Sequence, residues 1–223
     1  WKYYHHALIP TTAPNEPARV EELNCRAVWK EHKGTLFARW VTDFDCACET
    51  NWWYVVKDTA FDLNAVKAKR RYEINKGIRY FEVKRIDPRR YKKELYRVQI
   101  AAFSAYPEKY RPSVSEKEFT DGIDRWADFT VFGAFFRETE ELAGYAYVSK
   151  LNEKFVDFNV QKSDPQYEKY AVNAAMVAAV LAYFADFLSN GGMLCDGARS
   201  IRHETNFQDY LEKYFGFRKA YCR

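Results

Sequence analysis

Polar and apolar side chains alternate in the segment KFVDFNVQ, residues 154–161. In an extended strand this alternation places Asp157, Asn159 and Gln161 on one face and three apolar side chains on the other. A polar row on an interior strand is costly to bury unless it faces a wet cleft. A carboxylate in such a cleft can take a proton from a bound substrate, as general base catalysis requires. We therefore predict Asp157 as a catalytic base or orienting group, with Asn159 and Gln161 as substrate contacts; an outward-facing carboxylate is the alternative.

A second concentration of reactive side chains lies in CDGARSIRHETN, residues 195–206. Asp196 is expected at the carboxyl end of a short buried strand, where ligand crevices form in open sheets with parallel strands. An imidazole such as that of His203 can act as a base near neutral pH, and guanidinium groups clamp carboxylates or phosphates. The segment predicts Asp196 and His203 as catalytic residues and, as substrate contacts, Arg199, Arg202, Glu204 and Asn206. A solvated loop with incidental charges is the alternative.

Basic residues cluster in KAKRRYEINK, residues 67–76. At helical spacing Lys67, Arg70 and Arg71 share a face, and such a face can bind the phosphates of a nucleotide sugar, of coenzyme A or of a tRNA backbone. Arg70 and Arg71 are the predicted substrate contacts of this helix. Charge runs on helices usually face solvent, which is the competing interpretation.

The elements that position these groups follow from hydrophobic periodicity and turn signals. Strands are predicted at residues 34–44, 51–59, 79–86, 129–137, 142–150, 154–161, 192–197 and 217–222. Helices are predicted at residues 62–77, 89–106, 115–126, 165–190 and 205–217, with Gly77 closing the first and Pro165 opening the fourth. The regular alternation from residue 62 onward predicts an α/β domain of residues 62–223, preceded by a two-stranded extension of residues 1–61.

Composition excludes several classes of protein. The net charge of +4 over 223 residues gives no general nucleic-acid footprint. Five cysteines without paired CxxC spacings predict reduced thiols rather than a disulfide framework, and no metal site. The longest apolar run, residues 174–185, is shorter than the roughly 20 residues of a membrane-spanning helix. With no signal-peptide pattern at the start, we expect a cytoplasmic protein without a membrane span.

The order of elements resembles that of the GNAT acyltransferase superfamily. Three features carry the resemblance: a three-strand meander over residues 129–161, a proline-opened long helix after it, and a short last helix ending in YFGF. The segment LNAVKAKRRYEINKG is similar to the basic helix of FemABX-like peptidyltransferases and of related acyltransferases in polysaccharide biosynthesis. The resemblance covers residues 62–223 and implies a mixed, largely antiparallel central sheet flanked by helices.

The resemblance also implies where an acyl donor would bind. It places the donor at the opening of the long helix, with Lys169, Tyr170 and Asn173 as candidate contacts, and it suggests Tyr210 of the last helix as the acid for the leaving group. Acetyl-CoA-dependent members carry a glycine-rich loop there, whose backbone N–H groups hold the pyrophosphate. Residues 164–174 contain no glycine, and Glu168 would repel phosphate. This departure predicts weak binding of CoA and favours the FemABX-like branch, for which the resemblance implies a donor such as aminoacyl-tRNA, or an acyl thioester held differently.

We therefore expect transfer of an acyl or aminoacyl group from an activated donor, acyl-CoA or another thioester, to an amino group of a small or sugar-linked acceptor. Direct attack needs no metal and no covalent enzyme intermediate. The interpretation requires the end of the strand near Gln161 and the start of the helix near Pro165 to diverge, opening a slot with Asp157 and Asp196 on one side of the molecule. Two alternatives are an aminoacyl-tRNA-dependent peptidyltransferase and a non-catalytic carbohydrate- or protein-binding module. The tRNA partner is less favoured, and a homodimer is left open.

Overall fold

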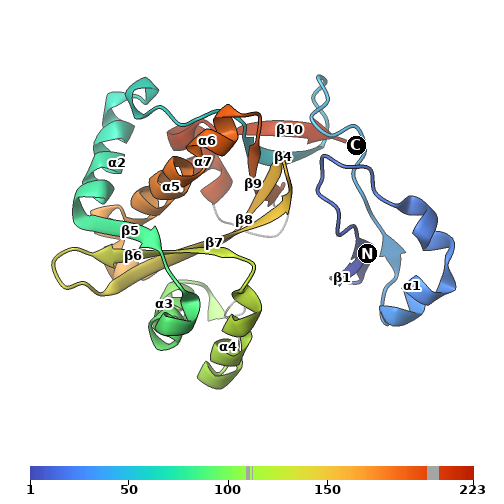
Figure 1. Ribbon diagram of the computed structural model, residues 1–223, viewed down its shortest axis with the longest axis horizontal. Helices are drawn as coiled ribbons and strands as arrows, with labels where there is room; N and C mark the ends of the chain where they lie inside the picture. The colour runs from blue at the N-terminus through green and yellow to red at the C-terminus, as the bar shows by residue number, and fades with distance from the viewer. Residues whose placement is uncertain (109–110, 112, 200–205) are drawn as a thin grey trace.

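A seven-stranded sheet forms the centre of the computed structural model, which describes residues 1–108, 111, 113–199 and 206–223 (Figure 1). Its strands, in spatial order, are β10 (Arg218–Cys222), β4 (Trp52–Lys57), β9 (Met193–Ala198), β8 (Phe155–Ser163), β7 (Leu142–Asn152), β6 (Thr130–Phe136) and β5 (Phe81–Arg85). All neighbouring strands are antiparallel except β8 and β9, which are parallel. The predicted fold class, a mixed and largely antiparallel sheet flanked by helices, is confirmed.

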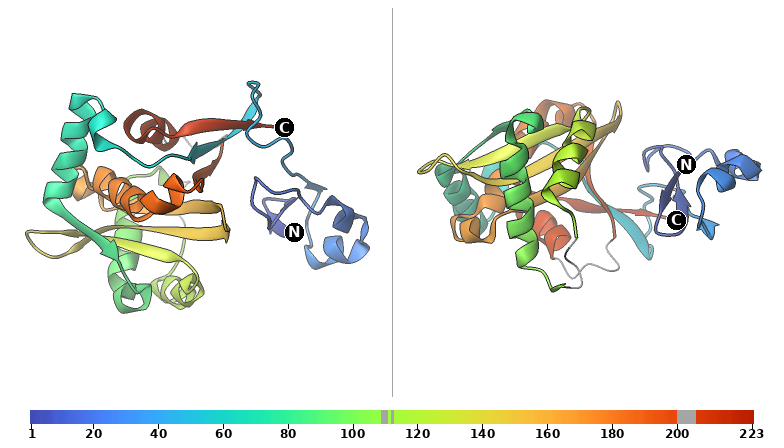
Figure 2. Two further views of the ribbon diagram at one scale, coloured as in Figure 1. Left: turned by 45° about the horizontal axis from the view of Figure 1, so that its top comes forward. Right: turned by 90° about the horizontal axis from the view of Figure 1, so that it is seen from below.

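Helices cover both faces of this sheet (Figures 1 and 2). One face carries α2 (Ala68–Tyr80), α5 (Val172–Tyr183), α6 (Ala185–Ser189) and α7 (Phe207–Phe215). The other carries α3 (Lys92–Ser104) and α4 (Glu116–Gly122), joined to short 3-10 turns at Pro88–Tyr91 and Ile123–Trp126. The apolar helix α5 lies between the sheet and α2, and eight of its side chains are buried. The main core is therefore on the α5 side.

The N-terminal part of the chain forms a second, small sheet beside the main one. It contains β1 (Lys2–Tyr4), β2 (Ala7–Ile9), β3 (Phe37–Ala38), a 3-10 turn at Val20–Asn24 and the helix α1 (Arg26–Glu31). The predicted strand over residues 34–44 is thus wrong for most of its length. The chain beyond β3 instead pairs Thr42 with Arg223 at the C-terminus, and Asp43 adopts a left-handed φ of 49° that interrupts extended backbone.

Strand β4 belongs to residues 1–61, yet it lies inside the main sheet between β9 and β10. It pairs antiparallel with both neighbours, and the β4–β9 register contains a bulge between Tyr54 and Val56. The predicted extension therefore supplies an interior strand as well as the small sheet. The boundary between residues 61 and 62 stays a prediction.

Two helix boundaries differ from those that the sequence predicts. Helix α2 continues through Gly77 to Tyr80, so Gly77 does not end it. Gly77 is instead a packing site, since a Cβ there would lie 2.5 Å from the Ala171 carbonyl oxygen. The predicted helix of residues 165–190 is broken into a 3-10 turn at Pro165–Tyr170, then α5, then α6. The first break occurs at Ala171, whose left-handed conformation (φ 62°, ψ 41°) cannot continue a helix.

Candidate functional site

A β-bulge in β8 separates the polar residues that alternation had placed together. Val160 pairs with Tyr147 and Phe158 pairs with Val148, so Asn159 has no partner on β7. A bulge of one residue reverses the faces of all side chains beyond it. The predicted common face of Asp157, Asn159 and Gln161 is therefore wrong for Gln161.

Beyond the bulge, β8 is joined to the start of α5. The Gln161 Nε2 and Ser163 Oγ atoms each donate a hydrogen bond of 3.0 Å to Oδ1 of Asn173. The Asp164 carboxylate accepts from the backbone N–H of Gln166 at 3.1 Å. These bonds close the expected slot between the strand end and the helix start, so that expectation is also wrong.

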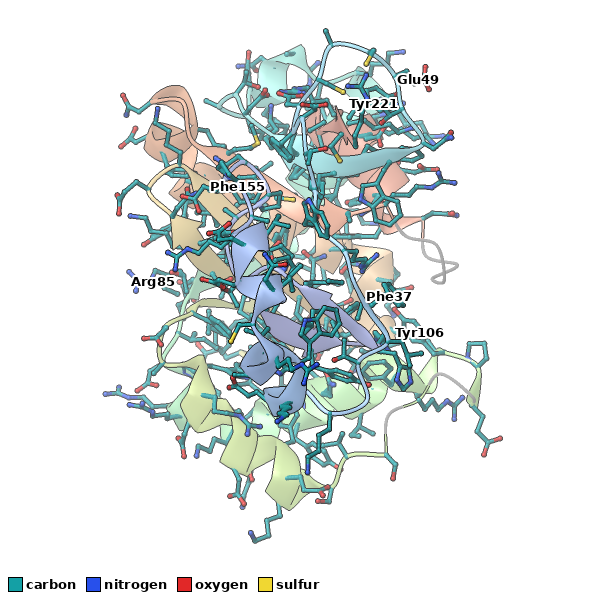
Figure 3. The ribbon with its side chains drawn as sticks, turned by 90° about the vertical axis from the view of Figure 1, so that its right-hand side faces the viewer. Phe37, Glu49, Arg85, Tyr106, Phe155 and Tyr221 are labelled. Carbon is teal, nitrogen blue, oxygen red and sulfur yellow. The ribbon has the colours of Figure 1, made fainter. Side chains whose placement is uncertain are left out.

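A cavity of about 670 Å³ lies instead at the other end of β8, between the sheet and the N-terminal segment. Figure 3 labels Phe155, one of the residues that line it. Strands β4, β7, β8 and β9 provide one wall, and residues 9–18 and 39–41 provide part of the opposite wall. Asp157 and Asn159 line it, together with aromatic side chains, namely Trp40, Trp52, Tyr54, Phe129 and Phe155. Because these residues come from segments far apart in the sequence, no local pattern could predict that they meet.

Asp157 is a half-buried carboxyl group in the wall of this cavity. Burial raises its pKa from 3.8 to about 6, although the positive charge of Lys2 lowers it in part. Its Oδ2 accepts a hydrogen bond of 2.9 Å from the Asn159 side chain. Within the described residues no cation forms an ion pair with it. A carboxylate with a pKa close to neutral, free of a fixed counter-ion, is suited to accept a proton.

Asp196 lies next to Asp157 in the sheet but on the other face. Asp157 pairs with Cys195, and consecutive residues of a strand point to opposite faces, so Asp196 points toward α7. There the Gln208 side chain, whose Nε2 donates to the Ala198 carbonyl oxygen at 3.1 Å, lowers the pKa of Asp196 in part. Burial raises the pKa of Asp196 to about 7, and the negative charge of Asp157 adds to the rise. The two carboxylates interact electrostatically, but they do not line one crevice as expected.

Strands β8 and β9 part at this pair of residues. Their parallel ladder consists of Phe155–Asp157 against Met193–Cys195 and ends there, while β8 continues to Ser163 paired with β7 alone. One edge of β8 beyond Asp157 is therefore not hydrogen-bonded to β9. Backbone N–H and C=O groups on such an edge can pair with an extended ligand.

The predicted residues on α2 and α7 lie away from the cavity. Arg70 donates to the Lys213 carbonyl oxygen and lies over the Tyr214 ring, and Arg71 donates to the Asn64 carbonyl oxygen at 3.1 Å. These contacts tie α2 to its neighbours. Tyr210 packs among the aromatic rings of its own helix, and burial raises its pKa.

The remaining predicted contacts do not gather at one place. Arg199 donates to the Asn51 carbonyl oxygen at 2.6 Å and lies over the Trp53 ring. Asn206 is exposed at the start of α7 and makes no capping bond. Arg202, His203 and Glu204 lie outside the described residues.

The opening of α5 does not fit the pyrophosphate of CoA. Val172 is 0% exposed and Ala171 8%, and the α2 backbone at Gly77 packs directly against Ala171 and Ala175. Lys169 is exposed, but Tyr170 packs against Tyr80 and Phe136 rather than facing a ligand site. A pyrophosphate needs free backbone N–H groups at a helix start. Here that start is covered by another helix.

The described residues contain neither a metal-binding cluster nor a helix that could span a membrane. Within residues 1–108, 111, 113–199 and 206–223, no group of three or more His, Cys, Asp or Glu side chains is arranged to hold a metal ion. In the same part of the chain no helix combines the length and the apolar character needed to cross a bilayer.

Comparison with known proteins supports the fold. No protein-family profile and no curated relative matches the sequence. A conserved protein of unknown function from Bacteroides thetaiotaomicron is similar in structure, with a TM-score of 0.56 at 10% identity over 78% of this chain and 60% of that one. FemX gives a TM-score of 0.55 at 10% identity, again over 78% of this chain and 60% of that one.

L-PGS from Bacillus licheniformis gives a TM-score of 0.51 at 13% identity, over 76% of this chain and 59% of that one. The chain thus spans about 60% of the length of each of these solved proteins. At these identities the likeness concerns the fold. The chain has a GNAT-like fold of the FemABX-like kind, which confirms the resemblance drawn from the order of its elements.

Proposed function

We propose that the protein transfers an acyl or aminoacyl group from an activated donor to an amine, with Asp157 as the base. The observation that carries this proposal is the position of Asp157. It is a carboxylate with a pKa raised to about 6 in the wall of a 670 Å³ cavity, at the point where β8 and β9 part. The GNAT-like fold supports acyl transfer as the reaction class.

The proposed reaction begins with the acceptor in the cavity. The ammonium group gives one proton to the Asp157 carboxylate, and the neutral amine then attacks the carbonyl carbon of the donor. A C–N bond forms, the bond to the leaving group breaks, and the leaving group departs with its electron pair. The nitrogen loses its second proton to solvent or to the leaving group. Holding both reactants in attack geometry provides much of the rate enhancement.

The proposed place for the donor is the edge of β8 beyond Asp157 that β9 leaves unpaired. An extended acyl arm with amide groups can hydrogen-bond there and bring its carbonyl carbon toward Asp157. We propose no binding site for the CoA pyrophosphate at the start of α5, because the α2 backbone at Gly77 packs against that start. The same observation favours the second candidate, an aminoacyl-tRNA donor, whose ester carries no pyrophosphate that must be held there. The fold similarity to FemX is compatible with it.

The test is a turnover assay with pooled amines and three donors: acetyl-CoA, a long-chain acyl-CoA and a mixture of aminoacyl-tRNAs, with products identified by mass spectrometry. Asp157→Asn should lower kcat by a factor of about 100 or more, since a general base contributes roughly 10²–10⁴. The matched control is Asp186→Asn, which changes an exposed carboxylate on α6. Equal turnover by wild type and Asp157→Asn would contradict the proposal. Loss of product on RNase treatment would select the tRNA donor.

A further inference from the structure

The cavity carries opposite charges on its two sides. Asp157 belongs to the sheet, whereas Arg39 belongs to the N-terminal segment, where its backbone N–H donates to the Leu8 carbonyl oxygen at 2.9 Å. The Arg39 guanidinium lies 5.7 Å from the centre of the Trp52 ring. Within the described part of the chain it has no acidic partner. An aromatic ring thus orients a cation whose charge is not compensated.

Tyr54 is influenced by both Arg39 and Asp157. Both Arg39 and Asp157 are close enough to Tyr54 to act on its hydroxyl: the cation lowers its pKa and the carboxylate raises it. Tyr54 also lines the cavity. The cation, the carboxylate and Tyr54 line one cavity, so a small molecule bound there can meet both charges.

The other charged residues of the cavity are less suited to bind an anion. Arg223 is paired with Asp43 at 2.8 Å and also hydrogen-bonds to Cys48. Lys2 acts electrostatically on Asp157 itself. Glu16 adds a negative charge on the N-terminal side. Arg39 is the cation that best fits an incoming anionic group.

The size and lining of the cavity indicate the rest of the ligand. A volume of about 670 Å³ is in the range of sites for small organic molecules. The walls include the rings of Trp52, Phe129 and Phe155. Such walls favour a ligand with an apolar or aromatic body beside its polar groups.

We propose that the acceptor is zwitterionic: an amine that also carries a carboxylate or phosphate-like group, with Asp157 at the amine, Arg39 at the anion and an apolar body between the aromatic walls. An aromatic α-amino acid has this chemistry. The assignment of the amine end rests on the proposed function, whereas the binding of the anion by Arg39 does not.

Four probes separate the contributions of the two charges. Phenylalanine carries both groups, phenylalaninamide lacks the carboxylate, 3-phenylpropionate lacks the amine, and the phosphonic acid analogue of phenylalanine replaces carboxylate by phosphonate. Titration by NMR or calorimetry should show saturable binding of phenylalanine at millimolar concentration or below. We expect each truncated probe to bind about 10- to 100-fold more weakly, since a hydrogen bond to a charged group has about that effect. The ratio of phosphonate to carboxylate affinity identifies the preferred anion.

Variants then assign each end of the ligand. Arg39→Gln should weaken phenylalanine at least tenfold and leave phenylalaninamide unchanged, while Asp157→Asn should weaken phenylalaninamide and leave 3-phenylpropionate unchanged. Arg26→Gln is the control, because Arg26 is exposed on α1 in the same N-terminal segment and does not line the cavity. Absence of binding by all four probes, or equal loss of phenylalanine and phenylalaninamide in Arg39→Gln, would overturn the inference.

The result also separates this inference from the proposed function. Asp157-dependent acylation of amines without an anionic group, at the rate of their zwitterionic counterparts, would uphold the function and overturn the zwitterion. Charge-selective binding combined with no product from any donor would uphold the zwitterion site and overturn the transferase.

Discussion

Asp196 allows a quantitative test of the electrostatics at the split between β8 and β9. Its pKa rises from 3.8 to about 7, mainly because burial disfavours the charged form, and the nearby Gln208 side chain offsets only part of that effect. This rise corresponds to roughly 4 kcal/mol by which ionisation of the carboxyl group destabilises the folded state. Asn at this position has nearly the same shape, but it carries no charge. We therefore expect Asp196→Asn to stabilise the protein.

The sign and pH range of the effect follow from linkage. The folded protein holds this proton more tightly than the unfolded chain, so wild-type stability falls as the pH rises from about 4 to about 7, and this loss is complete above about 7. The stabilisation by Asp196→Asn should accordingly be roughly 3 kcal/mol larger at pH 8.5 than at pH 5.

Urea unfolding at pH 5, 6.5 and 8.5 measures this difference directly. Asp186→Asn on the exposed surface of α6 is the control, and its effect should not change with pH by more than a few tenths of a kcal/mol. An Asp196→Asn effect that is independent of pH would refute the assignment of a buried, proton-binding carboxyl group. A stabilising effect at pH 8.5 combined with lower activity would indicate that the protein tolerates instability here for the sake of function.

Three further predictions concern the base, the helix contact and the donor. The rate of acyl transfer should fall as the pH falls below about 6, where Asp157 takes up its proton, and a pH profile of kcat/KM for Asp157→Asn should lack that limb. Gly77→Ala should destabilise the protein by about 1–3 kcal/mol in urea unfolding, because the methyl group meets the Ala171 carbonyl oxygen; Asn75→Ala, at an exposed position of the same helix, should not destabilise it. Calorimetry with acetyl-CoA should show no submicromolar binding, and tight binding would contradict the conclusion that the α5 opening excludes pyrophosphate.

Local signals in the sequence predicted the positions of helices and strands more reliably than the surroundings of individual side chains. Ser115 and Glu118 stand at capping-box spacing, and both hydrogen bonds of the capping box form at the start of α4. Leu95, Val98 and Ala102, which are spaced three and four positions apart, are buried on one face of α3. Such features depend on residues three or four positions apart, which is why a single sequence carries them.

The errors arise where distant segments decide local conformation. The bulge at Asn159 has no sequence signature, and it alone moves Gln161 from the Asp157 face to the α5 side. The sequence suggests Gly77 as a helix terminator, but this position requires glycine because of the close contact with Ala171. The cavity depends on Arg39 and Asp157, which lie more than a hundred positions apart.

The parallel pair β8–β9 explains why two perturbed carboxyl groups occur side by side. It is the one parallel pair in an otherwise antiparallel sheet, and its ladder ends at Asp157 and Cys195. The polar side chains at this end are shielded from water but do not lie in a continuous apolar core. On one face the N-terminal segment covers Asp157 only partly and leaves a cavity, so this carboxylate can meet a ligand. On the other face Asp196 points toward α7, and burial there disfavours the charged form of its carboxyl group. The same break in the sheet thus underlies both the catalytic role that we propose for Asp157 and the effect on stability that we predict for Asp196, and the two can be measured independently.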